Sequence, residues 1–444
     1  MNYQEFIAAK EFGRPMHGFS PSWMPDFLFP FQAKLVDWAI RIGRGALLED
    51  CGLGKSCQSL VWAENIVRKT NGNVLILTPL AVASQFVREG EKFGIKVNRM
   101  KDGSQMKKGI NVINYQRLHH LDPKDWVGLV ADESGILKNF DGKTRRAVTQ
   151  FVRTIKYRLL CTATPAPNDY MELGTSSEAL GVMSRNQMLG MFFTNGGEST
   201  QQWELKGHAR TRFWQWCSTW ARAIRKPSDL GFEDGDFQLP PLNMHHHVLK
   251  SNAPNGYFFP QAAQTLNDQR KESRASLKKR CEKMAEVLPD KGSVLVWCHL
   301  NDEASLMTEL ISGAKQVRGS DDDDVKEERI EAFATGKLRA LVIKPKIAAF
   351  GVNLQVCSNI AYVPSHSHEM WYQAVRRCWR FGQKNPVNCH LVYTEAETPV
   401  VTNMLHKERQ AIQMYEGIVR EMNFVQKHSD NNGGEECMKL PQWM

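Results

Sequence analysis

Short apolar runs alternate with amphipathic stretches along most of the chain. The runs lie at residues 74–77, 112–113, 127–130 and 158–160, and again at 294–297, 340–343, 360–363 and 390–393. Uniformly apolar runs of this length are typical of strands buried on both faces, and the segments between most of them have helical periodicity. The pattern therefore predicts an α/β fold with two lobes in tandem, each a mostly parallel sheet covered by helices.

Changes in this pattern suggest the domain boundaries. We expect an irregular lead-in over residues 1–26, lobe 1 over 27–240 and lobe 2 over 241–426. Lobe 1 carries a helical, Trp-rich bridging insertion at 174–238, and Leu239-Pro240-Pro241-Leu242 forms the crossover because two prolines prevent regular structure. The polar residues 427–444 are predicted to be disordered.

The composition of the chain favours an intracellular protein that binds a polyanion. The 444 residues contain 57 Lys and Arg against 48 Asp and Glu, and this basic balance suits a polyanionic partner. The ten cysteines form no C-x-x-C pair, which favours free thiols in a reducing compartment. The sequence has no apolar run of membrane-spanning length and no secretory signal, so we expect a cytoplasmic protein with no membrane partner.

A glycine-rich lysine loop follows an apolar run near the start of lobe 1. This loop is expected to bind phosphate groups at the N-terminus of the helix that follows it. It consists of Gly52, Leu53, Gly54, Lys55 and Ser56. Lys55 would bring positive charge to the β/γ-phosphates of ATP, and the Ser56 hydroxyl would bind Mg²⁺. The alternative is an ordinary turn, because Glu49 stands where the strict phosphate-loop pattern has its first glycine.

Two adjacent acids end the predicted strand at 127–130. Asp132 is placed to hold Mg²⁺, while Glu133 polarises a water for attack on the γ-phosphate. The alternative is a pair of acids at a helix start, where carboxylates are favoured. Thr162-Ala163-Thr164-Pro165 follows the strand at 158–160, so its polar groups are expected at the same sheet edge.

Three polar residues outside these segments are candidates for nucleotide contact. Gln32 begins a predicted helix and has one donor and one acceptor that match an adenine edge, or it is simply a solvated residue. Arg377 and Arg380 are three apart, so a helix would place both on one face to reach a phosphate from lobe 2. The alternative is a basic surface that is solvated or faces nucleic acid.

Basic and aromatic residues gather in the bridging region. Phe213, Trp216 and Trp220 are spaced as a core-facing helical stripe, although aromatics among basic residues also suit a nucleic-acid strand. The basic stretch from Arg270 to Arg280 is predicted to be solvated. Residues 245–247 are three consecutive histidines on a strand, which point to alternating faces and are interpreted as surface residues rather than metal ligands.

Taken in order, these motifs resemble those of helicase superfamily two, and within it the Swi/Snf-type DNA translocases. Gln32 resembles the adenine-reading glutamine, Gly52 to Ser56 the ATP loop and Asp132-Glu133 the DEAH-type box, and Lys138-Asn139 is a mark of the Swi/Snf branch. In lobe 2, Gly351-Val352-Asn353-Leu354 matches G-x-N-L, and Gln373, Arg377, Arg380, Gly382 and Gln383 match Q-x-x-x-R-x-x-R-x-G-Q. The resemblance spans roughly residues 28 to 395 and suggests a compact microbial or phage-type member.

The resemblance implies two RecA-like lobes that bind ATP and Mg²⁺ and move along double-stranded DNA without sequence preference. Gln32, Lys55, Ser56, Asp132 and Glu133 would act from lobe 1. Gly351, Asn353, Gln373, Arg377 and Arg380 would act from lobe 2. Two alternatives are a helicase that separates strands of DNA or RNA, and a nucleic-acid clamp without enzymatic activity.

Overall fold

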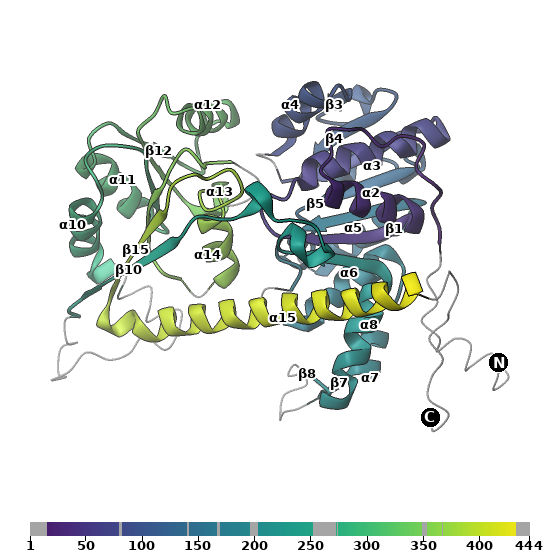
Figure 1. Ribbon diagram of the computed structural model, residues 1–444. Helices are drawn as coiled ribbons and strands as arrows, with labels where there is room; N and C mark the ends of the chain where they lie inside the picture. The colour runs from purple at the N-terminus through teal and green to yellow at the C-terminus, as the bar shows by residue number, and fades with distance from the viewer. Residues whose placement is uncertain are drawn as a thin grey trace. The chain divides into compact units, whose positions relative to one another are not determined.

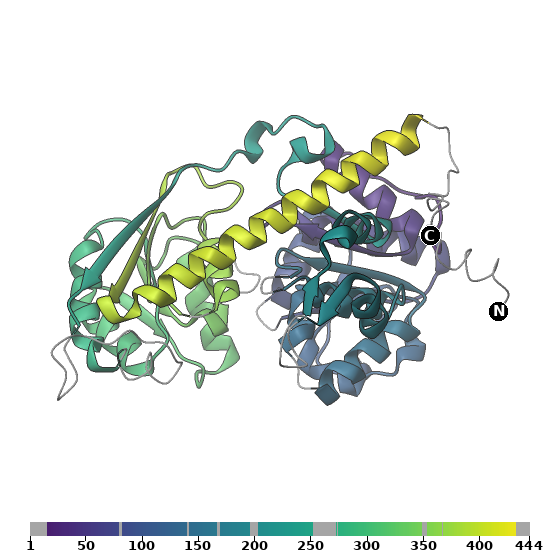
Figure 2. The same cartoon turned by 90° about the horizontal axis from the view of Figure 1, so that it is seen from below.

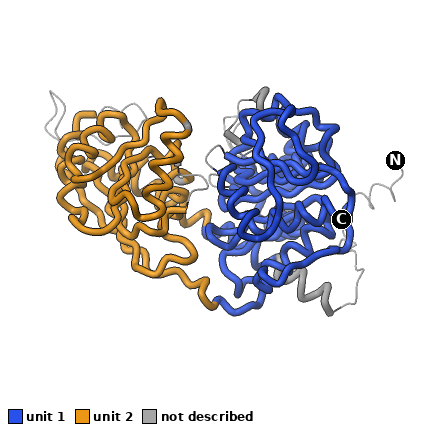
Figure 3. The backbone as a smooth tube through the Cα atoms, turned by 90° about the horizontal axis from the view of Figure 1, so that it is seen from above, with its two compact units in different colours: residues 1–234, 412–444 blue, residues 235–411 orange. Residues whose placement is uncertain are grey.

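The computed structural model describes residues 16–79, 82–139, 142–166, 169–195, 203–251, 272, 274–348, 353–365 and 367–431. The chain divides into two compact units, drawn in two colours in Figure 3. Unit 1 comprises residues 1–234 and 412–444, and unit 2 comprises residues 235–411. Each unit is an α/β structure built on its own parallel sheet, which confirms the predicted fold class.

Unit 1 is built on a seven-stranded sheet in the order β3-β4-β2-β5-β6-β1-β9. All six strand pairings are parallel. The strands are β1 (Arg44–Glu49), β2 (Val74–Thr78), β3 (Val97–Arg99), β4 (Ile110–Asn114), β5 (Gly128–Asp132), β6 (Tyr157–Thr162) and β9 (Ala221–Ile224). The apolar runs in this half of the sequence are thus strands, as predicted, whereas β3 and β9 were not predicted.

Helices cover both faces of this sheet (Figure 1). One core joins alternate strand residues to α5, α6, α7, α8 and the middle of α15, and α3 packs against the opposite face. The helices are α2 (Pro30–Ile42), α3 (Lys55–Thr70), α4 (Ala83–Phe93), α5 (Gly142–Thr154), α6 (Leu173–Leu180), α7 (Arg185–Phe192) and α8 (Arg210–Trp220). The small antiparallel pair β7 (Phe193–Asn195) and β8 (Trp203–Leu205) follows α7.

The aromatic stripe of α8 faces the core. Phe213, Trp216 and Trp220 are at most 1% exposed, and the ring centroids of Trp216 and Trp220 lie 5.5 Å apart. The packing interpretation is confirmed, and stacking of these rings on a nucleic-acid strand is excluded by their burial. The bridging region is also more than a helical insertion, because it supplies β9, which pairs with β1 at the edge of the main sheet.

Unit 2 is built on a six-stranded sheet in the order β10-β15-β14-β11-β13-β12, again with parallel pairings. Its strands are β10 (Leu242–Leu249), β11 (Val294–Trp297), β12 (Ala314–Val317), β13 (Ala340–Ile343), β14 (Asn359–Tyr362) and β15 (Val387–Thr394). Its helices are α10 (Leu277–Val287), α11 (Asn301–Leu310), α12 (Asp323–Ala334), α13 (Pro345–Ala348) and α14 (His368–Val375). The four runs predicted for this half are strands, and β12 was missed.

Arg280 corrects one prediction for unit 2. It ends the basic stretch expected to be solvated, yet it is fully buried in α10. Its guanidinium pairs with Glu303 at 2.5 Å and with Glu397 at 3.2 Å. Two carboxylates from distant parts of the sequence make burial of this charge tolerable, since a buried charge needs partners.

Helix α15 (Thr398–Asn431) is drawn in yellow in Figures 1 and 2. Val401 and Met404 belong to the core of unit 2, whereas Met414, Tyr415 and Ile418 belong to the core of unit 1. The helix thus crosses the unit boundary, and it continues past residue 427, where disorder was expected; residues 432–444 lie outside the described residues.

The other expected boundaries also differ from the observed units. Unit 2 begins at residue 235 rather than 241 and ends at 411 rather than 426. The helical periodicity of α15 does not change where the helix leaves the core of unit 2 and enters that of unit 1. The sequence pattern therefore could not predict this boundary. In the lead-in, the amide of His17 donates to the carbonyl of Ile42, and the ring of Phe19 packs on Tyr157 in unit 1. Within the described residues, no helix is long and apolar enough to cross a bilayer.

The consecutive histidines lie on β10, beside β15 (Figure 1). His245 stacks on His390 with centroids 4.8 Å apart, and Nε2 of His247 lies 3.0 Å from Nδ1 of His390. His246 instead contacts the hydroxyl of Tyr393, so the strand alternation is as predicted. Among the described residues, no group of side chains has the arrangement of a metal site.

We predict that this histidine cluster makes unit 2 less stable in acid. Burial, His245 and His247 lower the pKa of His390 to about 4, from an unperturbed value of 6.5. The unfolded chain therefore binds the proton more tightly, and stability present above pH 6.5 is lost as the pH falls toward 4. Thermal unfolding measured across this range should show a smaller loss for His390→Gln than for the native chain.

The matched control is His208→Gln, which removes an exposed histidine from unit 1. It should leave the pH dependence unchanged. Identical pH profiles for the native chain and His390→Gln would contradict the interpretation.

Candidate nucleotide site

The lysine loop joins β1 to α3 at the carboxyl edge of the unit 1 sheet. Gly52 and Gly54 both have φ of 91°, a left-handed conformation that glycine adopts without a steric cost. Gly54 caps α3, whose first residue is Lys55. The loop therefore directs the amino end of a 16-residue helix, and its positive dipole, toward the edge of the sheet.

The ammonium group of Lys55 is hydrogen-bonded to backbone carbonyl groups at the end of β1. Its Nζ donates to the carbonyl oxygens of Glu49 at 2.8 Å and Asp50 at 2.9 Å. An ammonium has three donors, and these carbonyls take two of them. The side chain is half-buried, so its charge acts at the sheet edge with less screening than at an open surface.

Gln32 packs directly against the lysine loop. It is 5% exposed, its Nε2 donates to the carbonyl of Leu53 at 2.7 Å, and its Oε1 accepts from the amide of Phe29. The interpretation of Gln32 as a solvated residue is therefore wrong. The amide oxygen and nitrogen can each make one further hydrogen bond, which keeps the predicted adenine contact chemically possible.

Asp132 is the last residue of β5 and Glu133 follows it. In the sheet, β6 lies between β5 and β1, the strand that leads into the lysine loop. Both are buried, at 8% and 7% exposure. Glu133 has φ of 53°, a left-handed conformation that costs a residue with a side chain about 1 kcal/mol. The strand thus ends at Asp132, and the carbonyl of Glu133 accepts from the amide of Ile136 in the following 3-10 helix (Ser134–Asn139).

The end of β6 lies between the end of β5, which carries Asp132, and the end of β1, which leads into the lysine loop. The Thr162 hydroxyl donates to Oε1 of Glu133 at 3.2 Å and accepts from the amide of Thr164. In the sheet register, Thr162 lies opposite Leu48 of β1, and Cys161 lies opposite Asp132 of β5. The sequence placed Thr162 at this edge, but it did not predict that its hydroxyl orients Glu133.

Two buried phenols support this edge from behind. The Tyr115 hydroxyl donates to the carbonyl of Asp132 at 2.8 Å, and the Tyr415 hydroxyl donates to the carbonyl of Ala163 at 2.5 Å. Burial raises the pKa of both phenols well above the ordinary value, so both remain protonated donors. Sequence patterns could not have identified them, because an apolar helical position occupied by tyrosine is most often core packing.

Burial also controls the charge of two carboxyls at the site. Burial raises the pKa of Asp132 to about 7; Glu133 acts in the same direction and Lys55 opposes it. Burial raises the pKa of Glu49 to about 7, although Lys55 and the hydrogen bond from Gln58 lower it. Glu49 is fully buried and bonded to Nε2 of Gln58 at 2.8 Å, so it supports α3 from below the loop.

In unit 2, the predicted arginines do not share a helical face, because α14 ends at Val375 and both lie in the turns that follow. Arg377 is 3% exposed and donates to the carbonyl and to Oε1 of Gln373, at 3.1 Å and 2.7 Å. Arg380 is half-buried. The structure thus brings Gln373 and Arg377 together and leaves Arg380 closer to the surface.

The end of this segment is fixed against the G-x-N-L segment. Nε2 of Gln383 donates to the carbonyls of Gln355 and Cys357, and the amide of Leu354 donates to the carbonyl of Arg377 at 3.0 Å. Asn353 is exposed and its Oδ1 accepts from the amide of Gln355. Gly351 lies outside the described residues, as do the side chains of Lys138 and Asn139.

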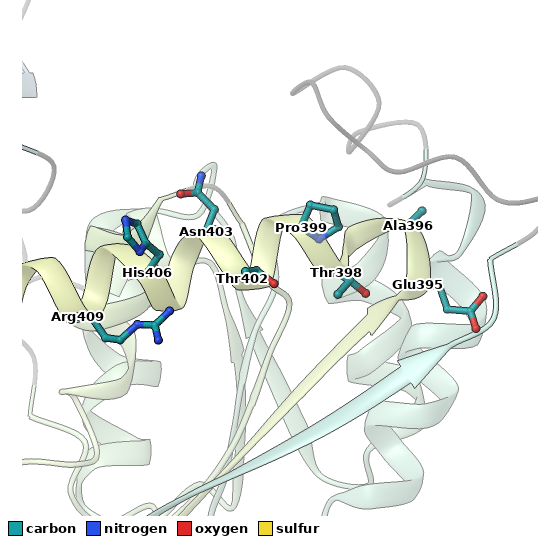
Figure 4. Close-up of a pocket in the computed structure, with 8 residues that line it drawn as sticks. All are labelled: Glu395, Ala396, Thr398, Pro399, Thr402, Asn403, His406 and Arg409. Carbon is teal, nitrogen blue, oxygen red and sulfur yellow. The ribbon is translucent and has the colours of Figure 1, made fainter. Parts of the chain in front are cut away.

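A separate hollow on unit 2 lies along the start of α15 (Figure 4). Its described lining residues fall between Glu395 and Arg409, and no predicted site residue is among them. We therefore assign the candidate site to the carboxyl edge of the unit 1 sheet, which carries the lysine loop, Asp132 and Glu133.

We predict that Gly54→Ala weakens nucleotide binding by about tenfold or more. The added Cβ would lie 2.3 Å from Nε2 of Gln32, so the lysine loop or Gln32 must move away from the position that nucleotide binding needs, and a tenfold loss of affinity corresponds to about 1.4 kcal/mol. Titration with a fluorescent ATP analogue measures the loss.

The control for this substitution is Gly94→Ala. Gly94 has φ of 68° at the end of α4, and a Cβ there has no described neighbour within 4 Å. It carries the same kind of strain away from the site and should leave nucleotide affinity unchanged. Equal losses in the two variants would mean that the close packing of Gly54 on Gln32 does not matter for binding.

Comparison with known proteins adds an independent observation. No protein-family model matches the chain. The chain is 26% identical over 168 residues to SWI/SNF chromatin-remodeling complex subunit snf22 of Schizosaccharomyces pombe, which covers 32% of this chain and 10% of that protein. It is 30% identical over 171 residues to chromodomain-helicase-DNA-binding protein 1-like of Danio rerio, covering 33% of this chain and 16% of that protein.

A third relative matches a longer part of the chain. Helicase SWR1 of Cryptococcus neoformans is 26% identical over 234 residues, which is 47% of this chain and 17% of that protein. The chain therefore spans less than a fifth of the length of each of these relatives. Over a third to a half of its own length, it is similar to helicase-like proteins of the SWI/SNF, chromodomain-helicase and SWR1 groups.

Proposed function

We propose that this protein is an ATP-driven motor that moves along double-stranded DNA. The observation that carries the proposal is the arrangement at the unit 1 sheet edge, where Lys55, Asp132, Glu133 and Thr162 come from the ends of three neighbouring strands. The similarity to chromatin-remodeling and helicase proteins supports the same activity, and a net charge of +9 suits a DNA partner.

The residues of unit 1 fit ATP and Mg²⁺. Asp132 is buried and its pKa is raised because its negative charge is costly there, and a divalent cation would offset that cost. Ser56, in the first turn of α3, would share the ion with Asp132. When bound, Mg²⁺ would neutralise charge on the phosphates.

Each side chain then has a distinct role. Lys55 neutralises the β/γ-phosphate charge, and the loop amides of Gly52 to Lys55 receive phosphate oxygens. Glu133, held by the Thr162 hydroxyl, orients a water for attack. Gln32 contacts the adenine from its position against Leu53.

Unit 2 completes the reaction when the two units close on the nucleotide. Arg377 and Arg380 would stabilise the negative charge that develops on the transferred phosphoryl group, and Gln373 holds Arg377 ready for this contact. Hydrolysis would therefore depend on closure, and DNA held by both units would experience each closure as a step. Contacts mainly to phosphates would make binding independent of sequence and sensitive to salt.

We predict that Glu133→Gln abolishes hydrolysis but not nucleotide binding. The amide cannot accept a proton from water, and loss of a general base typically costs about 10²–10⁴-fold in rate. ATP hydrolysis should be measured with duplex DNA, single-stranded DNA, RNA and no nucleic acid. The native chain should be stimulated most by duplex DNA.

The control is Glu91→Gln, which changes an exposed acid on α4 and should keep the native rate. Stimulation by single strands or RNA alone would support the strand-separating helicase instead. The proposed motor activity would be refuted if no nucleic acid changes the rate of ATP hydrolysis, or if the native chain does not hydrolyse ATP.

A further inference from the structure

A basic hollow lies on the helical layer of unit 1, between α5, α6 and the start of α7. We call it the α5 groove and define it by Arg145, Arg146, Arg153 and Arg185, which line it together with polar side chains. Helix α5 leaves the sheet edge after β5 and ends just before β6 begins at Tyr157. Arg153 therefore lies toward the amino edge of the sheet, opposite the edge that carries Lys55.

Two of the groove arginines lie on one face of α5, with Gln150 between them. Arg146, Gln150 and Arg153 are spaced i, i+4 and i+7, so they share one face of α5, and all three are exposed. Seven residues of helix span about 10 Å. Arg146 and Arg153, at the two ends of this span, can each contact a phosphate of one DNA strand, so this face of α5 supplies two phosphate contacts.

The charge in the groove is unbalanced. Glu178 is the single acid among its described lining residues, and its Oε2 accepts from the backbone amide of Arg185 at 3.4 Å. Within the described part of the chain, no ion pair engages the guanidinium groups of the four groove arginines. Asp169 interacts electrostatically with Arg185, so the four arginines still exceed the acids near them, although like charges repel.

The chemistry of the lining favours a phosphate backbone over a protein partner. The remaining lining side chains are hydroxyls and amides, including Thr149, Thr175, Ser184 and Asn186, which donate hydrogen bonds as phosphate and sugar contacts do. Guanidinium groups bind phosphate oxygens through paired hydrogen bonds. Among its described lining residues, none has the large apolar or aromatic side chains that anchor peptides at protein interfaces.

We propose that the α5 groove is a second binding site for nucleic acid, which holds the phosphate backbone of a DNA duplex away from the nucleotide edge. It would retain DNA when the nucleotide site is empty, because none of its residues contacts the lysine loop or the acids in unit 1's described structure. The site goes beyond the proposed motor activity and does not depend on it.

The test is nucleotide-free binding of a short fluorescein-labelled DNA duplex, followed by fluorescence anisotropy at several salt concentrations. Arg146→Gln combined with Arg153→Gln should weaken binding by about tenfold and reduce the slope of log affinity against log salt by about 1.8, or 0.9 for each lost phosphate contact. Circular dichroism and ATP hydrolysis without DNA should remain native, since neither arginine belongs to the nucleotide site.

The matched control is Lys107→Gln combined with Lys108→Gln. These exposed lysines also carry two charges and precede β4, at the amino edge of the same sheet. An equal loss in this control would mean that net charge alone attracts DNA. Unchanged duplex binding in the arginine variant would also overturn the proposal.

Competition with poly-glutamate distinguishes the partner. When poly-glutamate is added at the same total negative charge as unlabelled duplex, it should displace the labelled duplex less well than the unlabelled duplex does. If the two competitors displace it equally, the groove would be assigned to acidic peptides instead. A native chain that binds duplex through the α5 groove but never hydrolyses ATP would leave this proposal intact while refuting the motor. A native chain that hydrolyses ATP but does not bind duplex without nucleotide would refute the groove.

Discussion

A parallel sheet brings the carboxyl ends of all its strands to one edge, and the candidate site of unit 1 depends on this constraint. Residues that are far apart in the sequence, Lys55, Asp132 and Thr162, meet because β1, β6 and β5 are neighbours with the same direction. The strand backbones fix the positions of the residues that follow them, and the apolar side chains of the strands stabilise the fold of unit 1. The polar groups that follow each strand can therefore be specialised for chemistry without weakening the core.

The groups at this edge are held in place by hydroxyl groups of neighbouring side chains. The Thr162 hydroxyl fixes Glu133, the Tyr115 hydroxyl holds the backbone of Asp132, and the Tyr415 hydroxyl holds the backbone after Thr162. Tyr415 comes from α15, a helix that begins in the core of unit 2. One helix therefore carries side chains into both hydrophobic cores, and in the proposed motor it would join the nucleotide edge to unit 2.

Local pattern predicted the two α/β lobes and the strands that are continuous apolar runs, because burial on both faces leaves a strong signal. It missed β3, β9 and β12, which are short and contain charged residues. It took Arg280 for a solvated residue because Glu303 and Glu397 are distant in sequence. The lysine loop and the two acids were predicted from their motifs, and the structure describes where they lie in unit 1. The supporting phenols and the end of α14 depend on tertiary packing, which no local pattern records.

The account rests on the claim that one unit binds ATP and the other completes its hydrolysis. The most direct test is to substitute alanine for Arg380 and to measure ATP binding and hydrolysis separately. Nucleotide affinity should stay within a few-fold of the native value, while the hydrolysis rate should fall by about 10³-fold or more, as expected when an arginine that stabilises the transition state is lost. A variant that hydrolyses ATP at the native rate would contradict the account.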